Sequence, residues 1–361
     1  LMDKKEFLNS PNITDLIKTI VNKLCSEEVF KSDSKLLLKK YESSMKKINF
    51  ILVDGLGSKN IENLDNILTQ NQTDEIVSTF PSSTSVALGS VNLGSDPIEN
   101  GLIGYYHFDK SENKLINTLN WRGSENYLQD KKFFSNQKTI WNILNEKNIV
   151  FNVIQPKNLI DTSLSKHLYR GANQIGYESL DELGEIFTLP NILDNQFNFL
   201  YYPVIDVAAH VYGTNSEEWL IEVKKFSEFL SEITKSDEGR YTCLTADHGV
   251  INVDDENRHK IIYDDSVKIY GDQRSVYING DMKKIKNIFK NIPGHFLEKQ
   301  EIESLIGLPN DDERNNFFPE HVFLLDDGHI IFPNHLSANL RGYHGGLSPK
   351  EVAIPLIEIV S

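Results

Sequence analysis

The sequence contains little cysteine. Cys25 and Cys243 are the two thiols among 361 residues, too few for the disulfide framework of a small secreted scaffold. Cys243 lies within a strand-like apolar run, where we expect a buried structural thiol. With 39% apolar and 25% charged residues, the composition is that of a globular protein.

The sequence also contains few basic residues relative to acidic ones. Lysine and arginine number 37 against 52 acidic residues, a net charge of -15. A general nucleic-acid binder carries a basic face, so we expect no specific nucleic-acid partner. The charge does not exclude a substrate that carries phosphate, because bound metal cations reverse the local field at a site.

Long apolar runs are absent. The longest are strand-sized, so we expect no membrane span. The N-terminal residues Leu1 to Lys5 lack the apolar core of a secretion signal. As it stands, the sequence predicts a cytoplasmic protein, or a secreted or periplasmic one if a signal peptide was removed. It carries no signal for an oligomeric state.

Strand-like and helix-like segments alternate along much of the chain. This alternation predicts an α/β fold with a mostly parallel central sheet and helices on both faces. The length exceeds the usual single core, so an insertion or a second domain is expected. The expected strands are 49–53, 149–154, 199–205 and 241–245, and the expected helices are 84–93, 139–147 and 217–234.

Changes in the sequence pattern predict three parts. Residues 1–47 are expected to form a helical lead-in packed on the core. Residues 48–255 and 341–361 are expected to form the α/β core, which the strand 352–360 completes. Residues 256–340 are expected to be an inserted α+β subdomain with an aromatic strand, a lysine-rich helix and a polar stretch, at 274–278, 282–291 and 309–319.

Acidic residues and histidines stand at the ends of apolar runs. Ligands of such sheets lie at the carboxyl ends of strands. Three carboxylates and three imidazoles placed there would converge and hold two divalent ions, zinc first and manganese as the alternative. These residues are Asp54, Asp206, His210, Asp247, His248 and His344.

Each of these motifs has a simpler interpretation when taken alone. Asp206 and His210 have the four-residue spacing that also arises by chance on helices. Asp247 could cap a turn with His248 exposed, and His344 could be a surface residue of a glycine loop. Agreement among the separate segments favours the metal site.

A hydroxyl nucleophile is expected near the first helix. Ser82 and Ser83 precede the apolar-periodic run 84–93, which Gly94 closes, so Thr84 falls in the first helical turn. Metal coordination lowers the pKa of a threonine hydroxyl, and the N–H groups of a helix N-terminus bind phosphate oxygens. Thr79 and Ser85 are the competing hydroxyls.

Taken together, the motifs resemble the alkaline phosphatase superfamily, in particular its type I phosphodiesterase/nucleotide pyrophosphatase family. The resemblance covers residues 49–360, and its motifs occur in family order. They are Val53-Asp54-Gly55, Thr84 through Gly94-Ser95-Asp96-Pro97 and Gly101, Asp206-x-x-x-His210-x-x-Gly213, Thr245-Ala246-Asp247-His248-Gly249 and His344-Gly345-Gly346-Leu347-Ser348-Pro349.

The resemblance implies an alkaline-phosphatase-like fold, a nucleophile and two ligand sets. The family spacing from the nucleophile to Gly94, Pro97 and Gly101 favours Thr84 over Thr79. It also implies that the reaction passes through a phosphothreonine. One implied ion is held by Asp206, His210 and His344, and the other by Asp54, Asp247 and His248 with Thr84.

The sequence departs from the family pattern at two positions that the resemblance places near the substrate. Asn100 stands where the family often has histidine, and Tyr105 where it often has a phosphate-contacting asparagine. We expect Tyr105 and His107 to line the substrate pocket. Arg274 is the expected cation if the substrate is a monoester, because a monoester carries an additional negative charge.

The expected function is hydrolysis of a small, nucleotide-like phosphodiester or phosphoanhydride. The alternatives are a phosphomonoesterase or phosphonate hydrolase on the same metal core, and a binding module that keeps the fold without catalysis.

Overall fold

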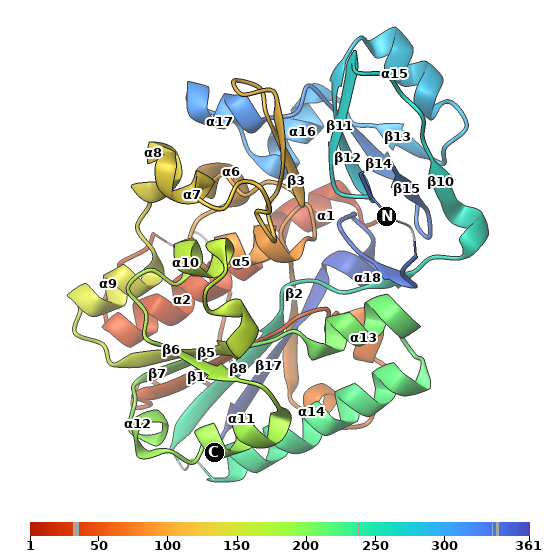
Figure 1. The fold of residues 1–361 in the computed structure, drawn as a ribbon. Helices are drawn as coiled ribbons and strands as arrows, with labels where there is room; N and C mark the ends of the chain where they lie inside the picture. Colours follow the sequence, from red (N-terminus) through yellow and green to blue (C-terminus); the bar gives the residue numbers. More distant parts are fainter. Residues whose placement is uncertain (32–35, 237–238, 334, 337–338) are drawn as a thin grey trace.

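The computed structural model describes residues 1–31, 36–236, 239–333, 335–336 and 339–361. Its centre is a seven-stranded sheet in the order β2-β17-β8-β1-β7-β5-β6 (Figure 1). The five strands from β8 to β6 run parallel to one another, and β17 runs antiparallel to both of its neighbours, β8 and β2. This confirms the predicted mostly parallel sheet. The strands are β1 (Lys47–Val53), β2 (Gln72–Val77), β5 (Phe151–Pro156), β6 (Gln174–Tyr177), β7 (Phe197–Tyr202), β8 (Arg240–Ala246) and β17 (Ala353–Val360).

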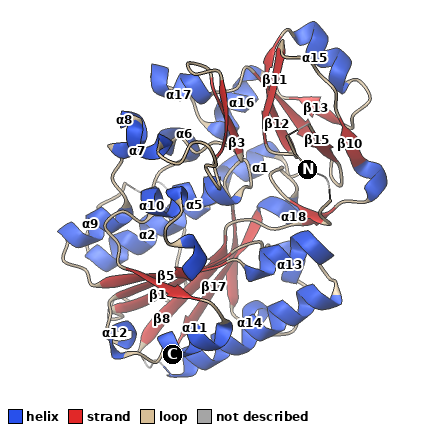
Figure 2. Ribbon diagram, viewed as in Figure 1, coloured by secondary structure: helices blue, strands red, loops and turns tan. Residues whose placement is uncertain are grey.

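Helices cover both faces of the central sheet (Figure 2). The predicted helix 84–93 is observed with the same bounds. One side carries α2 (Ile13–Cys25), α5 (Thr84–Leu93), α9 (Ile140–Glu146) and α10 (Ser163–Leu168). The other carries α11 (Leu180–Ile186), α13 (Val204–Tyr212) and α14 (Glu217–Ser236). No helix among the described residues is long and apolar enough to cross a membrane.

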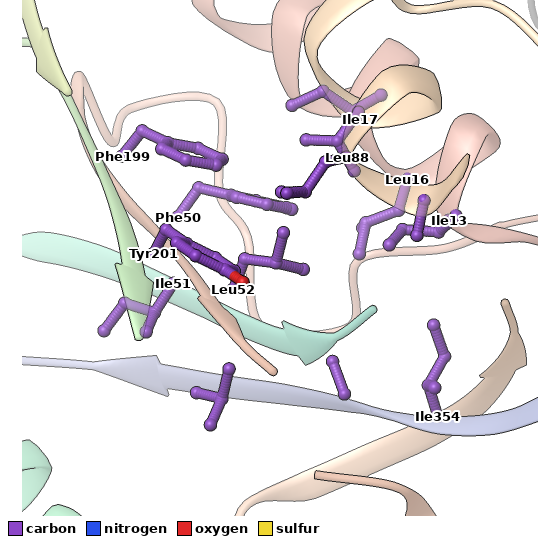
Figure 3. Close-up of a cluster of buried hydrophobic side chains, with 14 of the residues drawn as sticks. Ile13, Leu16, Ile17, Phe50, Ile51, Leu52, Leu88, Phe199, Tyr201 and Ile354 are labelled. Carbon is purple, nitrogen blue, oxygen red and sulfur yellow. The ribbon is translucent and has the colours of Figure 1, made fainter. Parts of the chain in front are cut away.

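Strand β1 lies in the middle of the main hydrophobic core. It reads as a nearly continuous apolar run because the sheet is covered on both faces. The Phe50 ring stacks on that of Phe199 from β7, with centroids 5.8 Å apart. Figure 3 shows the neighbouring apolar side chains of α2 and α5, which are Ile13, Leu16, Ile17 and Leu88.

The N-terminal segment contributes apolar side chains to this core, and it is less helical than the sequence predicts. Its helices are α1 (Lys4–Asn9) and α2, and residues 36–46 contain no helix; residues 32–35 lie outside the described part. The backbone N–H groups of Lys39 and Lys40 each donate to the buried carboxylate of Glu358, both at 3.0 Å. These bonds replace the intrahelical ones that the prediction assumed.

A second sheet lies above the carboxyl ends of the parallel strands (Figure 1). Its order is β13-β14-β12-β11-β3-β4, and it packs on its own apolar cluster. The predicted 256–340 subdomain supplies four strands, but β3 and β4 come from the predicted core. The strands are β3 (Tyr106–Asp109), β4 (Lys114–Asn117), β11 (Val267–Gly271), β12 (Ser275–Gly280), β13 (Gly294–Phe296) and β14 (His321–Leu325).

The remaining elements are short. Two two-stranded sheets are formed by β10 (Arg258–Lys260) with β15 (Ile330–Phe332) and by β9 (Ile251–Asn252) with β16 (Gly342–Tyr343). The helices α15 (Met282–Phe289), α16 (Lys299–Ile306) and α17 (Asp312–Phe317) lie around the six-stranded second sheet. The other short helices are α3 (Ser58–Ile61), α4 (Ile67–Gln70), α6 (Pro97–Asn100), α7 (Tyr127–Asp130), α8 (Lys132–Ser135), α12 (Pro190–Leu193) and α18 (Pro349–Val352).

Candidate active site

Three aspartates meet at the carboxyl edge of the central sheet. Asp54 follows β1, Asp247 follows β8, and Asp206 lies in the first turn of α13, directly after β7. Strand β1 pairs with both β7 and β8, so the three segments end side by side. All three aspartates are buried. The convergence expected from the strand ends is therefore present.

One donor group consists of Asp54, Asp247 and His248, whose ligand atoms all lie within 4.8 Å of one another. His248 Nε2 is 3.4 Å from Asp54 Oδ1 and 3.3 Å from Asp247 Oδ2. Thr84 Oγ1 lies 3.0 Å from the same nitrogen. These are the residues that the family resemblance placed around one ion.

A second donor group is formed by Asp206, His248 and His344. The resemblance expected His210 here together with Asp206 and His344. His210 is adjacent, with Nε2 3.1 Å from Asp206 Oδ2 and its ring 5.2 Å from that of His344. His248 belongs to both groups because its ring stacks on His344 at 3.6 Å. The two groups are therefore contiguous.

Backbone carbonyl groups orient the three imidazoles. Nδ1 lies 2.7 Å from Gly342 O in His210, 2.8 Å from Ser82 O in His344 and 3.1 Å from Gly249 O in His248. When Nδ1 donates its proton to the carbonyl oxygen, Nε2 keeps a free lone pair toward the carboxylates. This is the tautomer that a metal-binding histidine requires.

The electrostatics of the cluster favour a bound cation. Burial and the neighbouring Asp247 and Asp206 carboxylates raise the pKa of Asp54, and burial raises the pKa of Asp247 to about 7. Among the described residues, three buried carboxylate oxygens have no hydrogen-bond partner: Asp54 Oδ1, Asp206 Oδ1 and Asp247 Oδ2. Buried charge without a partner is costly, so this donor set fits divalent metal ions.

Metal binding is therefore expected to stabilise the fold. Adding Zn²⁺ or Mn²⁺ to chelator-treated protein should raise the thermal midpoint, because a ligand present at 100 times its Kd contributes about 2.7 kcal/mol per site. Differential scanning calorimetry measures the shift. An Asp54→Asn/Asp206→Asn variant, which removes one carboxylate from each group, should lose most of it. The buried Asp109 lies outside both groups, so Asp109→Asn should keep it; equal shifts in both variants would contradict metal binding here.

The competing hydroxyls are engaged elsewhere. Thr79 Oγ1 donates to Pro81 O at 2.9 Å, and Ser85 Oγ shares a 2.7 Å hydrogen bond with Thr118 Oγ1. Of the three, Thr84 is the residue whose hydroxyl contacts the Asp/His groups. The geometry therefore favours Thr84 as nucleophile.

Arg274 does not fit the substrate role expected of it. Its side chain is fully buried and bonds Glu351 Oε1 at 3.0 Å and Oε2 at 2.8 Å. It also donates to the carbonyl oxygens of Asp326 and His329, both at 2.6 Å, and contacts Asp327 Oδ1 at 3.5 Å. All the guanidinium donors are therefore used within the protein. The prediction was wrong because the sequence does not reveal the buried partner, Glu351.

Two other expected substrate contacts also have partners within the protein. His107 is buried, its Nε2 accepts the Ile103 N–H at 3.0 Å, and its ring packs against Phe317. Burial lowers the pKa of His107 to about 3. These contacts make His107 a structural residue. Tyr105 is half-buried, with its ring 5.1 Å from that of Tyr106, and its substrate role remains a prediction.

Asp272 and Tyr201 were missed by the sequence reasoning. The Tyr201 hydroxyl donates to Asp54 Oδ2, a contact that no local motif signals. Asp272 Oδ2 accepts the N–H of Tyr105 at 3.1 Å. Because Asp272 directly follows the β11 strand, its position at a strand end is the signal that could have revealed it.

Comparisons with known proteins find a matching family and similar folds. The family described as type I phosphodiesterase/nucleotide pyrophosphatase matches residues 50–303. No protein with a curated description matches the sequence. Murine ectonucleotide pyrophosphatase/phosphodiesterase 5 has a similar fold, with a TM-score of 0.68 at 15% identity over 87% of this chain and 88% of that one.

Two further solved structures share the fold. An inactive variant of the same murine protein, in complex with AMP, has a TM-score of 0.67 at 15% identity over 86% and 87% of the two chains. Phosphonoacetate hydrolase from Sinorhizobium meliloti 1021, in complex with phosphonoacetate, has a TM-score of 0.64 at 17% identity over 87% and 90%.

Proposed function

Because the chain belongs to the type I phosphodiesterase/nucleotide pyrophosphatase family and is thus a hydrolase of phosphorus esters, we propose that it cleaves phosphodiester or phosphoanhydride bonds through a phosphothreonine at Thr84. The observation that carries the proposal is the placement of Thr84. Its hydroxyl lies 3.0 Å from His248 Nε2, beside both Asp/His groups and in the first turn of α5.

The proposed metal ligands are the residues that converge at the sheet edge. Asp54, Asp247 and His248 would hold one ion with Thr84, and Asp206 and His344 would hold the other with His210. Two divalent ions, zinc first and manganese as the alternative, would lower the pKa values of the Thr84 hydroxyl and of water and balance charge on the phosphoryl group.

The proposed reaction has two balanced steps. Thr84 Oγ1 forms a bond to phosphorus as the bond to the leaving-group oxygen breaks, and the leaving group departs with the proton that Thr84 released. Water then attacks the phosphothreonine, so Thr84 regains its proton and the monoester is released. The N–H groups of the first turn of α5 have no partners within the helix, and they would hold the phosphoryl oxygens.

The substrate we propose is small and nucleotide-like. This rests on the family and on the AMP found in the inactive variant of the murine neighbour. Arg274 is hydrogen-bonded to Glu351, so it is not available to balance the additional negative charge of a monoester. This supports a diester substrate over a monoester. Phosphonate hydrolysis is the second candidate function, because phosphonoacetate hydrolase has a similar fold.

Comparing rates on three substrates tests the proposal. With Zn²⁺ or Mn²⁺ supplied, we expect bis-p-nitrophenyl phosphate to be cleaved faster than p-nitrophenyl phosphate, and phosphonoacetate least. Release of nitrophenolate and of inorganic phosphate reports the rates, with chelator-treated protein as the control. A faster monoester or phosphonate would overturn the diester assignment. No metal-dependent cleavage of any of the three would favour a binding module.

A further inference from the structure

The turn between β11 and β12 supplies polar contacts to the loops of the candidate active site. The Asp272 carboxylate accepts the Tyr105 N–H at 3.1 Å and a hydrogen bond from the Ser83 side chain. Ser83 immediately precedes Thr84. At the start of β12, Ser275 Oγ donates to Gly345 O at 2.5 Å, and Gly345 follows His344. The second sheet therefore contacts both the nucleophile turn and the His344 loop.

These two loops are also joined directly through Ser82. The Ser82 carbonyl oxygen lies 2.8 Å from His344 Nδ1. Its hydroxyl donates to Gly346 O at 2.9 Å and accepts the N–H of Gly345 at 3.1 Å. A shift of the segment containing Ser82, Ser83 and Thr84 would therefore move His344 as well.

Asp272 is packed tightly against this junction. Gly345 has a φ of +105°, and a Cβ built there would lie 2.7 Å from Asp272 Cβ. Asp272 is only 5% exposed, and burial raises the pKa of its carboxyl group to about 7. A buried carboxyl group is costly unless its hydrogen bonds repay it, and the described bonds run to Ser83 and Tyr105.

We propose that Asp272 is a positioning residue that fixes Thr84 relative to His344 by holding Ser83 and bracing the backbone at Gly345. Asp272 acts through these neighbours and is not itself a metal ligand or nucleophile. The inference rests on the proposed function of Thr84. In this proposal, the turn between β11 and β12 of the second sheet helps to align the reacting groups.

The expected signature is a loss of kcat with little change in KM. A displacement of about 1 Å at a reacting group costs on the order of 100-fold in rate. We therefore expect Asp272→Ala to lower kcat on bis-p-nitrophenyl phosphate by roughly 10- to 100-fold, with KM within about 3-fold of wild type. Asp272→Asn keeps the shape and one acceptor oxygen, so its kcat should lie between those of wild type and Asp272→Ala.

A double-variant cycle separates positioning from general destabilisation. Ser83→Ala removes the donor of the same contact and should lower kcat in the same direction. The Ser83→Ala/Asp272→Ala variant should be no slower than Asp272→Ala alone, because contacts in one network are not additive. Additive losses, or wild-type kcat in all three variants, would overturn the proposal. If Asp272→Ala does not fold, Ser83→Ala and Asp272→Asn with their double variant carry the same test.

Asp109→Asn is the matched control. Asp109 is also a buried carboxyl group of the second sheet, and it accepts hydrogen bonds from Ser111 and Asn316 at 2.6 and 2.8 Å. We expect it to lose stability but keep kcat. If it lowers kcat as Asp272→Ala does, the effect is structural and the positioning role is wrong. An inactive wild type would count against the proposed function, whereas an active wild type with fully active Asp272 variants would count against this inference alone.

Discussion

Replacing Thr84 with alanine is expected to lower kcat by roughly 10⁴- to 10⁶-fold, the range seen when a nucleophile acting within a catalytic unit is removed. The hydroxyl that contacts His248 is the atom that would bond to phosphorus, and alanine has no replacement for it. Steady-state turnover of bis-p-nitrophenyl phosphate measures the loss. Acid quenching of the wild-type reaction, followed by peptide mass spectrometry, should find the phosphoryl group on Thr84.

The matched control is Thr79→Ala. Thr79 is also buried and lies five residues earlier, but its hydroxyl donates to Pro81 O, so kcat should stay close to wild type. Thr84→Ala should retain the thermal shift with Zn²⁺, because both Asp/His groups remain. If Thr84→Ala keeps full turnover, or if Thr79→Ala loses activity instead, Thr84 is not the nucleophile.

Replacing Arg274 with alanine is expected to lower the free energy of unfolding by about 3–5 kcal/mol. The reason is that Glu351 would remain fully buried without its charge partner. Glu351 also accepts the N–H of Gly346 at 2.9 Å and that of Ser348 at 3.2 Å. The loop that follows His344 should therefore loosen, and urea denaturation measures the loss.

Lys225→Ala supplies the comparison for this second variant. Lys225 pairs with Glu222 at 2.7 Å on the surface of α14, where the lysine side chain is 54% exposed. Surface pairs contribute about 0–1 kcal/mol, so the loss should be small. If Arg274→Ala unfolds no more easily than Lys225→Ala, the buried pair is not the support inferred for the loop.

Local patterns were sufficient to predict much of the fold. The apolar runs gave β1, β7 and β8 to within a few residues, and the helix 84–93 was predicted with its observed bounds. The N-terminal segment was predicted less accurately, because residues 36–46 are held by backbone hydrogen bonds to Glu358, near the other end of the sequence. No helical or strand period reveals such a long-range contact.

The candidate site shows the same division. Asp54, Asp206 and Asp247 were found because each follows a strand or begins the helix after one, and parallel strands bring such residues to one edge. The environment of Arg274 was not found, since a guanidinium available to substrate and one bonded to a buried carboxylate look alike in sequence. Asp272 was overlooked because its partners, Ser83 and Gly345, are distant along the chain.

The sequence by itself determined the α/β fold class, the six Asp and His residues of the cluster, and a hydroxyl at the start of α5. It could do so because a residue's place at a strand end or helix start depends on its near neighbours. Only the tertiary structure decided that His248 joins both donor groups, that Arg274 is bound to Glu351, and that Asp272 contacts Tyr105 and Gly345. Those contacts join segments that meet only when the two sheets pack together.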